Sequence, residues 1–156
     1  MEKDNKPIIE HINGFMEYLD IEQGLSNKSQ ETYGRFLAKF SHWLIANQLD
    51  KLLPHELTED HIRKYRVFLS QGFNKATKEP IKRSTQNYHL IALRNLLNYF
   101  TNRDILSLPS EKIKLIKEQE RTVKFLDLDQ IKKLLSAPNS ENIIGLRDRT
   151  ILETFF

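Results

Sequence analysis

Residues 24–44 read GLSNKSQETYGRFLAKFSHWL, and this stretch decides the fold. Ser26 suits a helix N-cap, because its hydroxyl can accept a hydrogen bond from a free backbone N–H of the first turn. Behind it, apolar residues recur at three- and four-residue intervals, the spacing of one face of an α-helix. These residues are Tyr33, Phe36, Leu37, Phe40, Trp43 and Leu44. The stretch predicts a long amphipathic helix that ends near Gln48.

The same periodicity continues on both sides of this helix, and strand-like alternation is hard to find. A first helix is predicted from Pro7 to about Gln23, a third from Thr58 to about Gly72, and a fourth from Ser84 to about Asn102. Residues 72–84 have no apolar period and predict a polar loop. Four amphipathic helices with short connections are sufficient for a compact bundle, so the predicted fold class is all-α.

The pattern changes after Pro109. Residues 111–124 are highly charged, and we interpret 109–124 as a linker. Asp127 with Gln130 three residues later resembles a capping box, which predicts a short helix that closes before Pro138.

A last helix is predicted over 142–156. It ends on Phe155 and Phe156 with neither a glycine nor a polar cap. Because helices rarely stop on two exposed aromatic residues, we expect the natural protein to continue beyond this point.

Composition excludes several classes of protein. The 156 residues are 39% hydrophobic and 29% charged, which suits one soluble globular domain or a small domain plus part of a second. No apolar run is long enough for a membrane helix or a signal peptide, so we expect a cytoplasmic protein with no membrane partner. The absence of cysteine removes disulfides and thiolate zinc sites, and no two of the five histidines are spaced i, i+4. We therefore predict neither a metal site nor a cofactor.

The charge is mildly basic overall, at +3, but it is unevenly distributed. Residues 61–83 hold seven Lys or Arg against one acid, Glu79: Arg63, Lys64, Arg66, Lys75, Lys78, Lys82 and Arg83. If the second and fourth helices lie side by side, two helix N-termini with hydroxyls and cations could face one DNA duplex. Any soluble helical bundle also has cationic outer faces, so composition leaves a solvated surface and a DNA-binding surface both open.

Catalytic constellations are absent from the sequence. There is no phosphate-binding glycine loop, serine elbow or His/Glu zinc motif. Glu59 and Asp60 fall at a helix start, where the helix dipole accounts for them. His61 and His89 are interpreted as surface or packing residues. The five tyrosines are interpreted as core residues in preference to nucleophiles.

Three segments resemble one protein family in the order in which they occur. Residues 24–33, followed by Phe36, Leu37 and Phe40, resemble the second helix of the phage-integrase core-binding domain, a SAM-like domain. Residues 83–94, RSTQNYHLIALR, resemble the fourth helix of that domain. Residues 125–152, with Gly145-Leu146-Arg147-Asp148-Arg149, are similar to the opening of the tyrosine recombinase catalytic domain, except that Asp127 stands where the family often has Ser or Thr.

The resemblance is closest to Xer-type and phage integrases. It implies a four-helix SAM-like core-binding domain over 1–108, the linker over 109–124 and the start of a catalytic domain over 125–156. The implied activity is cutting and rejoining DNA strands through a tyrosine-phosphate intermediate, without metal or ATP, as in DNA integration and recombination. The catalytic arginines, lysine, histidines and tyrosine would all follow Phe156, so none is assigned here. Arg147 and Arg149 are expected to pair with Asp148 or Glu153.

We therefore expect these 156 residues to bind the double-stranded DNA of a recombination site, beside other recombinase protomers, and to cleave nothing. The predicted DNA contacts are Lys28, Thr32, Arg35, Lys39, Lys82, Arg83, Ser84, Thr85, Asn87, Tyr88 and Arg94. Most are expected on phosphates, with Asn87, Tyr88 and Arg94 as the base readers. Two alternatives stay open: a protein-interaction module that uses the first helix and the Phe155-Phe156 end, and a natural truncated regulator that occupies recombination sites without recombining them.

Overall fold

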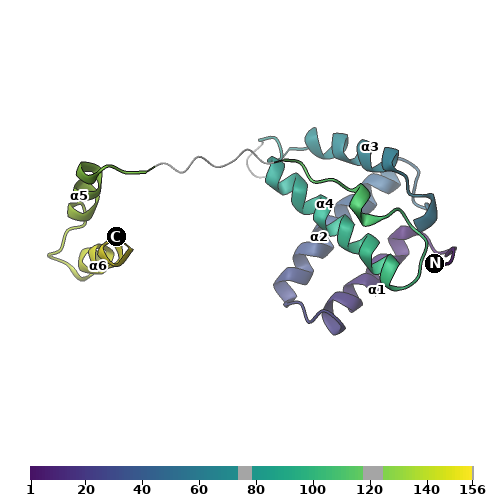
Figure 1. Cartoon of the computed structure of the whole chain (residues 1–156), viewed down its shortest axis with the longest axis horizontal. Coiled ribbons are helices and arrows are strands. Elements are labelled where there is room, and N and C mark those ends of the chain that lie inside the picture. The colour runs from purple at the N-terminus through teal and green to yellow at the C-terminus, as the bar shows by residue number, and fades with distance from the viewer. Residues whose placement is uncertain (74–78, 118–124, 156) are drawn as a thin grey trace. The chain divides into compact units, whose positions relative to one another are not determined.

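The computed structural model describes residues 1–73, 79–117 and 125–155. The chain divides into two compact units, Met1–Glu118 and Gln119–Phe156. The described residues form six α-helices and two short 3-10 helices, with two isolated β-bridges and no strand (Figure 1). This confirms the predicted all-α fold class.

The first unit contains the four predicted helices. They are α1 (Ile8–Ile21), α2 (Asn27–Ala46), α3 (Glu59–Ser70) and α4 (Arg83–Asn102). Both predicted hydroxyl caps are confirmed, because the side chain of Ser26 accepts from the Ser29 N–H and that of Thr58 from the His61 N–H. The fourth helix begins one residue earlier than predicted, with Lys82 at the N-cap position and no side-chain cap bond. Ser84 therefore lies inside the first turn.

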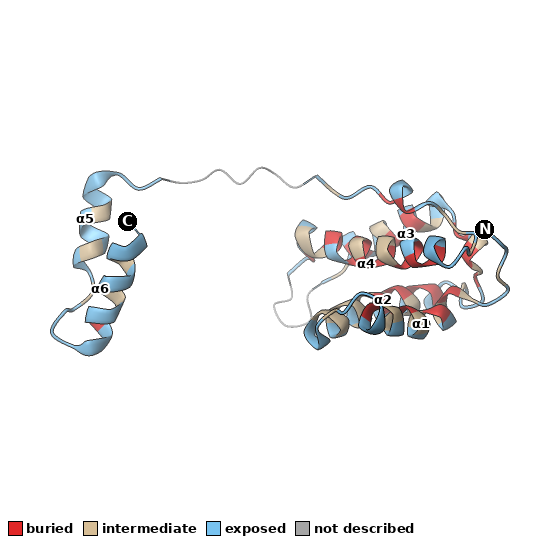
Figure 2. Ribbon diagram, turned by 60° about the horizontal axis from the view of Figure 1, so that its bottom comes forward, coloured by how far each residue is buried: buried red, intermediate tan, exposed pale blue. Residues whose placement is uncertain are grey.

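The helices of the first unit form two layers, one of α1 and α2 and one of α3 and α4, with buried residues between them (Figure 2). Short 3-10 helices, η1 (Pro54–Glu56) and η2 (Ser110–Lys112), lie in the connections. The core between the layers is built largely from side chains that are at most 1% exposed: Ile8, Phe15, Leu37, Phe40, Leu44, Tyr65, Leu69, Leu90, Leu93, Leu96, Leu97 and Phe100. Helix α2 contributes Leu37, Phe40 and Leu44 of its apolar stripe to this core, as the periodicity predicts.

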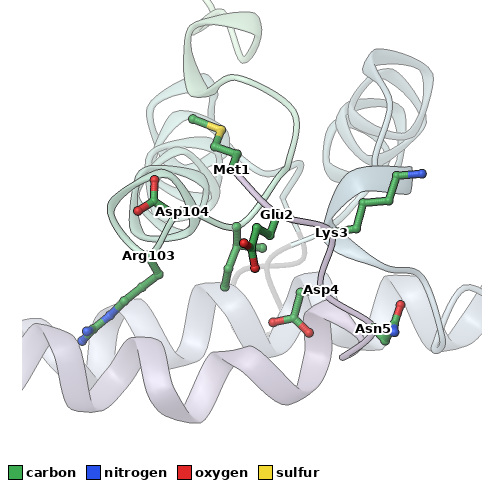
Figure 3. Close-up of a pocket in the computed structure, with 8 residues that line it drawn as sticks. Met1, Glu2, Lys3, Asp4, Asn5, Arg103 and Asp104 are labelled. Atoms are coloured by element: carbon green, nitrogen blue, oxygen red, sulfur yellow. The ribbon is translucent and has the colours of Figure 1, made fainter.

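The N-terminal segment is hydrogen-bonded to the residues that follow the C-terminal end of α4. Glu2 forms a parallel bridge with Ile105, in which its N–H donates to Asp104 and its carbonyl accepts from Leu106 at 2.8 Å. A pocket of about 830 Å³ lies between this segment and residues 103–105, lined by both acidic and basic side chains (Figure 3). Because it follows the C-terminal end of α4, it lies at the opposite end of that helix from the predicted DNA contacts.

The second unit is a pair of helices, α5 (Leu128–Ser136) and α6 (Ile143–Phe155). The capping box is confirmed: Asp127 accepts from the Gln130 N–H at 2.8 Å, and the Gln130 side chain accepts from the Asp127 N–H. Arg147 pairs with Asp148 and Arg149 with Glu153, as expected. Gly145 is the one buried residue among those described in this unit, and a Cβ there would lie 1.8 Å from the Asn139 carbonyl oxygen. Phe156 lies outside the described residues.

Much of the apolar surface of this unit is exposed. Phe125, Ile143 and Phe155 are each 87% or more accessible to solvent. Within the described part of the chain, no helix is both long and apolar enough to span a membrane.

Tyr65 offers a test of the core. Its ring is fully buried between Phe40 and Trp43, and its hydroxyl has no hydrogen-bond partner among the described residues. Burial of this group also raises the pKa of the phenol. A buried polar group without a partner destabilises the folded state, so Tyr65→Phe is expected to raise the free energy of unfolding by about 1 kcal/mol in urea denaturation.

The control is Tyr33→Phe. The Tyr33 hydroxyl accepts a 2.6 Å hydrogen bond from Asn95, so losing it should lower the free energy of unfolding by about 1 kcal/mol. A decrease of equal size in Tyr65→Phe would mean that the Tyr65 hydroxyl is satisfied after all.

Candidate nucleic-acid interface

A half-open groove of about 930 Å³ lies on the first unit, between α2, α3 and the start of α4. Helix α2 contributes Arg35, Phe36, Ala38, Lys39 and His42, and α3 contributes Phe68. The remaining lining residues are Phe73, residues 79–82, Thr85, Tyr88 and His89. The groove therefore brings together five of the predicted DNA contacts: Arg35, Lys39, Lys82, Thr85 and Tyr88.

The direction of packing between α2 and α4 explains which residues meet. Asn95 bonds to Tyr33, whereas Tyr88 and His89 pack on Phe36, so the contacting pairs advance in opposite directions along the two helices. The N-terminus of α4 thus lies beside the middle of α2, near Lys39 and His42. In the view of Figure 1 the two helices cross each other, and the expectation that both of their N-termini face one duplex stays a prediction.

Aromatic rings form the apolar part of the groove. Tyr88 stacks on Phe36 with ring centroids 6.3 Å apart and an interplanar angle of 4°. The Arg35 guanidinium lies 5.5 Å from the centre of the Phe36 ring, and the Lys39 ammonium lies 5.8 Å from that of Phe68. Such cation–π contacts hold cationic side chains at defined positions without neutralising them.

The groove and its rim carry an excess of positive charge. Arg35, Lys39 and Lys82 line it, Arg83 follows Lys82, and Glu79 is the one acidic residue among the described lining residues. Arg35, Lys82 and Arg83 are exposed, and none of the three forms an ion pair with a described acidic residue. A concave surface lined by one sign of charge attracts anions of the opposite sign.

The basic cluster of residues 61–83 is not one continuous patch. Asp60, just outside that range, bonds to Arg63 at 2.8 Å and to Lys64 at 2.9 Å. These partners, Lys64 first and then Arg63, lower the pKa of Asp60 to about 2. Arg66 is partly buried, and its Nε and one terminal nitrogen have no acceptor among the described residues. Lys75 and Lys78 lie outside the described residues.

The first turns of α2 do not reach the groove. Lys28 pairs with Glu31 at 2.9 Å, and the Thr32 hydroxyl donates to the Lys28 carbonyl. Arg94 is half-buried more than a turn beyond Tyr88 on α4, and it does not line the groove either.

Asn87 is placed differently from the other predicted contacts. Its side chain is 8% exposed, and its amide bonds to the backbone of Ile116 through both the nitrogen and the oxygen. A base reader must present its amide to solvent, so the structure contradicts that role for Asn87. It lies on the buried face of α4, three residues before Leu90.

Sequence reasoning missed His42 and treated His89 only as a surface or packing residue. His42 is exposed and lies three residues after Lys39 and seven after Arg35, a spacing that places all three on one helix face and could have identified it. His89 is buried under the groove, packed edge-on against Phe36 at 4.5 Å. Burial, together with the positive charges of Lys39 and Arg35, lowers the pKa of His89 to about 4.

Comparison with known proteins identifies this arrangement. Residues 12–104 match the family model of the phage integrase N-terminal SAM-like domain. The chain therefore belongs to the phage integrase family of tyrosine recombinases, and its similarity is to the Xer type.

Three curated relatives illustrate the similarity. Tyrosine recombinase XerC of Pelobacter propionicus is 30% identical over 152 residues, 97% of this chain and 48% of its own. Tyrosine recombinase XerC of Syntrophus aciditrophicus is 30% identical over 94% of this chain and 47% of its own. Tyrosine recombinase XerD of Listeria monocytogenes is 29% identical over 93% of this chain and 46% of its own. The chain thus spans about half the length of the curated relatives it matches, and no solved structure matches it significantly.

The buried His89 predicts a pH dependence of stability. In the unfolded chain the imidazole binds a proton below its ordinary pKa of 6.5, whereas in the folded protein it stays neutral down to about 4. The unfolded state then binds more protons in this window, so the free energy of unfolding falls as the pH drops from about 6.5 to about 4. Between about pH 7 and about pH 5 the expected loss is about 2 kcal/mol.

Urea denaturation at the two pH values measures this loss. Burial also lowers the pKa of His11, so the informative quantity is the difference between the wild type and His89→Gln. In His89→Gln the free energy of unfolding should fall less between the two pH values, because the variant lacks the imidazole that takes up a proton on unfolding. An identical pH dependence in the two proteins would show that His89 does not cause the loss of stability at low pH.

Proposed function

We propose that this chain binds double-stranded DNA as the N-terminal part of a site-specific tyrosine recombinase. The observation that carries the proposal is the groove between α2 and α4, where Arg35, Lys39, Lys82 and Arg83 gather around a lining that contains one acid. A duplex carries two phosphate charges per base pair, and several cations on one face bind it by releasing its counterions. The names of the relatives, all tyrosine recombinases, support the same assignment.

The proposed mode of binding places the start of α4 against the duplex. Arg35, Lys39, Lys82 and Arg83 contact phosphates, and Ser84 and Thr85 add hydroxyls beside the free N–H groups of the first helical turn. Tyr88, which is 57% exposed, is the residue best placed to reach a base edge. Lys28, Thr32 and Arg94 lie outside the groove and are proposed only as peripheral contacts.

We further propose that these 156 residues hold DNA and do not cleave it. Strand cutting and rejoining would belong to the whole recombinase, acting with other protomers on the same site. The groove offers cations, hydroxyls and stacked rings, which are binding groups.

A protein-interaction role is the second candidate, and the exposed apolar side chains of α5 and α6 favour it. Ile143 and Phe155, at the two ends of α6, are 87% and 88% exposed, and Ile144, Leu146 and Ile151 between them are exposed as well. Sedimentation with and without DNA discriminates between the two roles. Association that needs no DNA and disappears in Ile143→Asp favours the second candidate, whereas a monomer that assembles only on DNA favours the first.

DNA binding is tested by titrating the chain against a mixed-sequence duplex over a range of salt concentrations. With the four groove cations on phosphates, the slope of log K against log salt should be about −4. Arg35→Ala and Arg83→Ala should each weaken binding about fivefold to tenfold and make the slope shallower by about one unit.

The matched control is Arg63→Ala. Arg63 is a cation of the same predicted cluster, but it bonds to Asp60 and does not line the groove. It should bind DNA as the wild type does. A slope near zero, or an equal loss in Arg63→Ala, would rule out the groove as the binding surface.

A further inference from the structure

Asn87 holds a segment of chain that lies 29 residues further along the sequence. Its Nδ2 donates to the Ile116 carbonyl at 2.9 Å, and its Oδ1 accepts from the Ile116 N–H at 2.8 Å. Among the side chains, only the amides of Asn and Gln offer a neutral donor and acceptor in this arrangement. The two bonds clamp the backbone of one residue, much as a neighbouring strand would.

The clamped segment runs back along α4. The helix ends at Asn102, and the chain reverses through Asp104, which has a φ of 56°. Ser110 and Ile113 are then buried, the latter at 1% exposure, and Lys112 pairs with Glu59 of α3 at 3.0 Å. Figure 1 shows this segment lying beside α4.

The clamp therefore determines where the chain leaves the first unit. Asn87 lies about 22 Å from Asn102 along the helix, at about 1.5 Å per residue. The boundary between the two compact units follows Glu118, two residues after Ile116. The departure point lies at the N-terminal half of α4, the same half that carries Thr85 and Tyr88 on its other face.

We propose that Asn87 is a positioning residue that fixes the point from which the second unit is tethered. Without the clamp, the last strong anchor of this segment is the buried Ile113, and residues 114–116 would join the tether. Three residues add up to about 10 Å of reach. A longer tether lowers the effective concentration of the second unit at the surface of the first.

The tethering role of Asn87 is separate from DNA binding, although the same helix carries the candidate interface. It is measured on the chain without DNA, so the result does not depend on whether the groove binds DNA.

The absence of cysteine makes the measurement direct, since two introduced cysteines are the only labelling sites. Glu17→Cys on α1 and Lys133→Cys on α5 are exposed positions for nitroxide labels. Pulsed electron resonance then gives the distribution of distances between the two units. Asn87→Ala should broaden this distribution and extend it by about 10 Å, consistent with up to about 3.5 Å of reach for each released residue.

Amide hydrogen exchange tests the clamp itself. The Ile116 N–H should exchange about tenfold faster or more in Asn87→Ala, because its acceptor is lost. The matched control is Asn95→Ala, which removes a hydrogen bond from the same helix to Tyr33 and leaves Ile116 untouched. It should change neither the exchange at Ile116 nor the distance distribution.

A second variant keeps the test valid if Asn87→Ala folds poorly. Ile116→Pro removes the N–H that Asn87 accepts while leaving α4 unchanged, and it should lengthen the distances in the same way. An unchanged distribution in a folded Asn87→Ala or Ile116→Pro protein would overturn the proposal. So would an equal change in Asn95→Ala, since the effect would then follow from a general loss of stability.

Discussion

The packing of the aromatic face of α2 across α4 is the contact on which the rest of the structure depends. The ring of Phe36 packs against Tyr88 and His89. The Tyr33 hydroxyl accepts a hydrogen bond from Asn95. The ring of Phe40 packs against Tyr65 of α3. These rings join the two layers of the first unit and set the register between their helices. This register places Arg35 and Lys39 beside the start of α4. The same contacts thus form the core and the candidate interface.

The helices were predictable from the sequence because their signals are local. The Ser26 and Thr58 caps and the Asp127–Gln130 capping box each lie within four residues of the groups they bond, and the apolar periodicity of α2 extends over about three turns. The groove was only partly predictable. Its residues come from three helices and a loop, and their meeting depends on where the helices cross, which no local pattern encodes.

Asn87 shows what a residue-type argument omits. An asparagine in a polar, basic stretch beside an exposed tyrosine suggests recognition, yet the 100° turn per residue separates neighbouring positions on a helix. Asn87 lies three residues before Leu90, six before Leu93 and ten before Leu97, which is the spacing of the buried face. Tyr88, one residue later, is 57% exposed. The position of each residue around the helix can be read from the sequence, and it assigns Asn87 and Tyr88 to different faces. The partner of Asn87 lies 29 residues away and cannot be predicted in this way.

The cations of α3 and those of the groove have different surroundings, and this difference bears on which of the two surfaces can bind an anion. On α3, the Asp60 carboxylate forms ion pairs with both Arg63 and Lys64. A phosphate that bound there would have to compete with this carboxylate. In the groove, Arg35 and Lys39 rest on aromatic rings, and His89 beneath them stays neutral partly because of their charge. A ring quadrupole holds a cation in place without cancelling its field. Like charges gathered in this way repel one another in the free protein, and under the proposed function the phosphates of a bound duplex would relieve that repulsion.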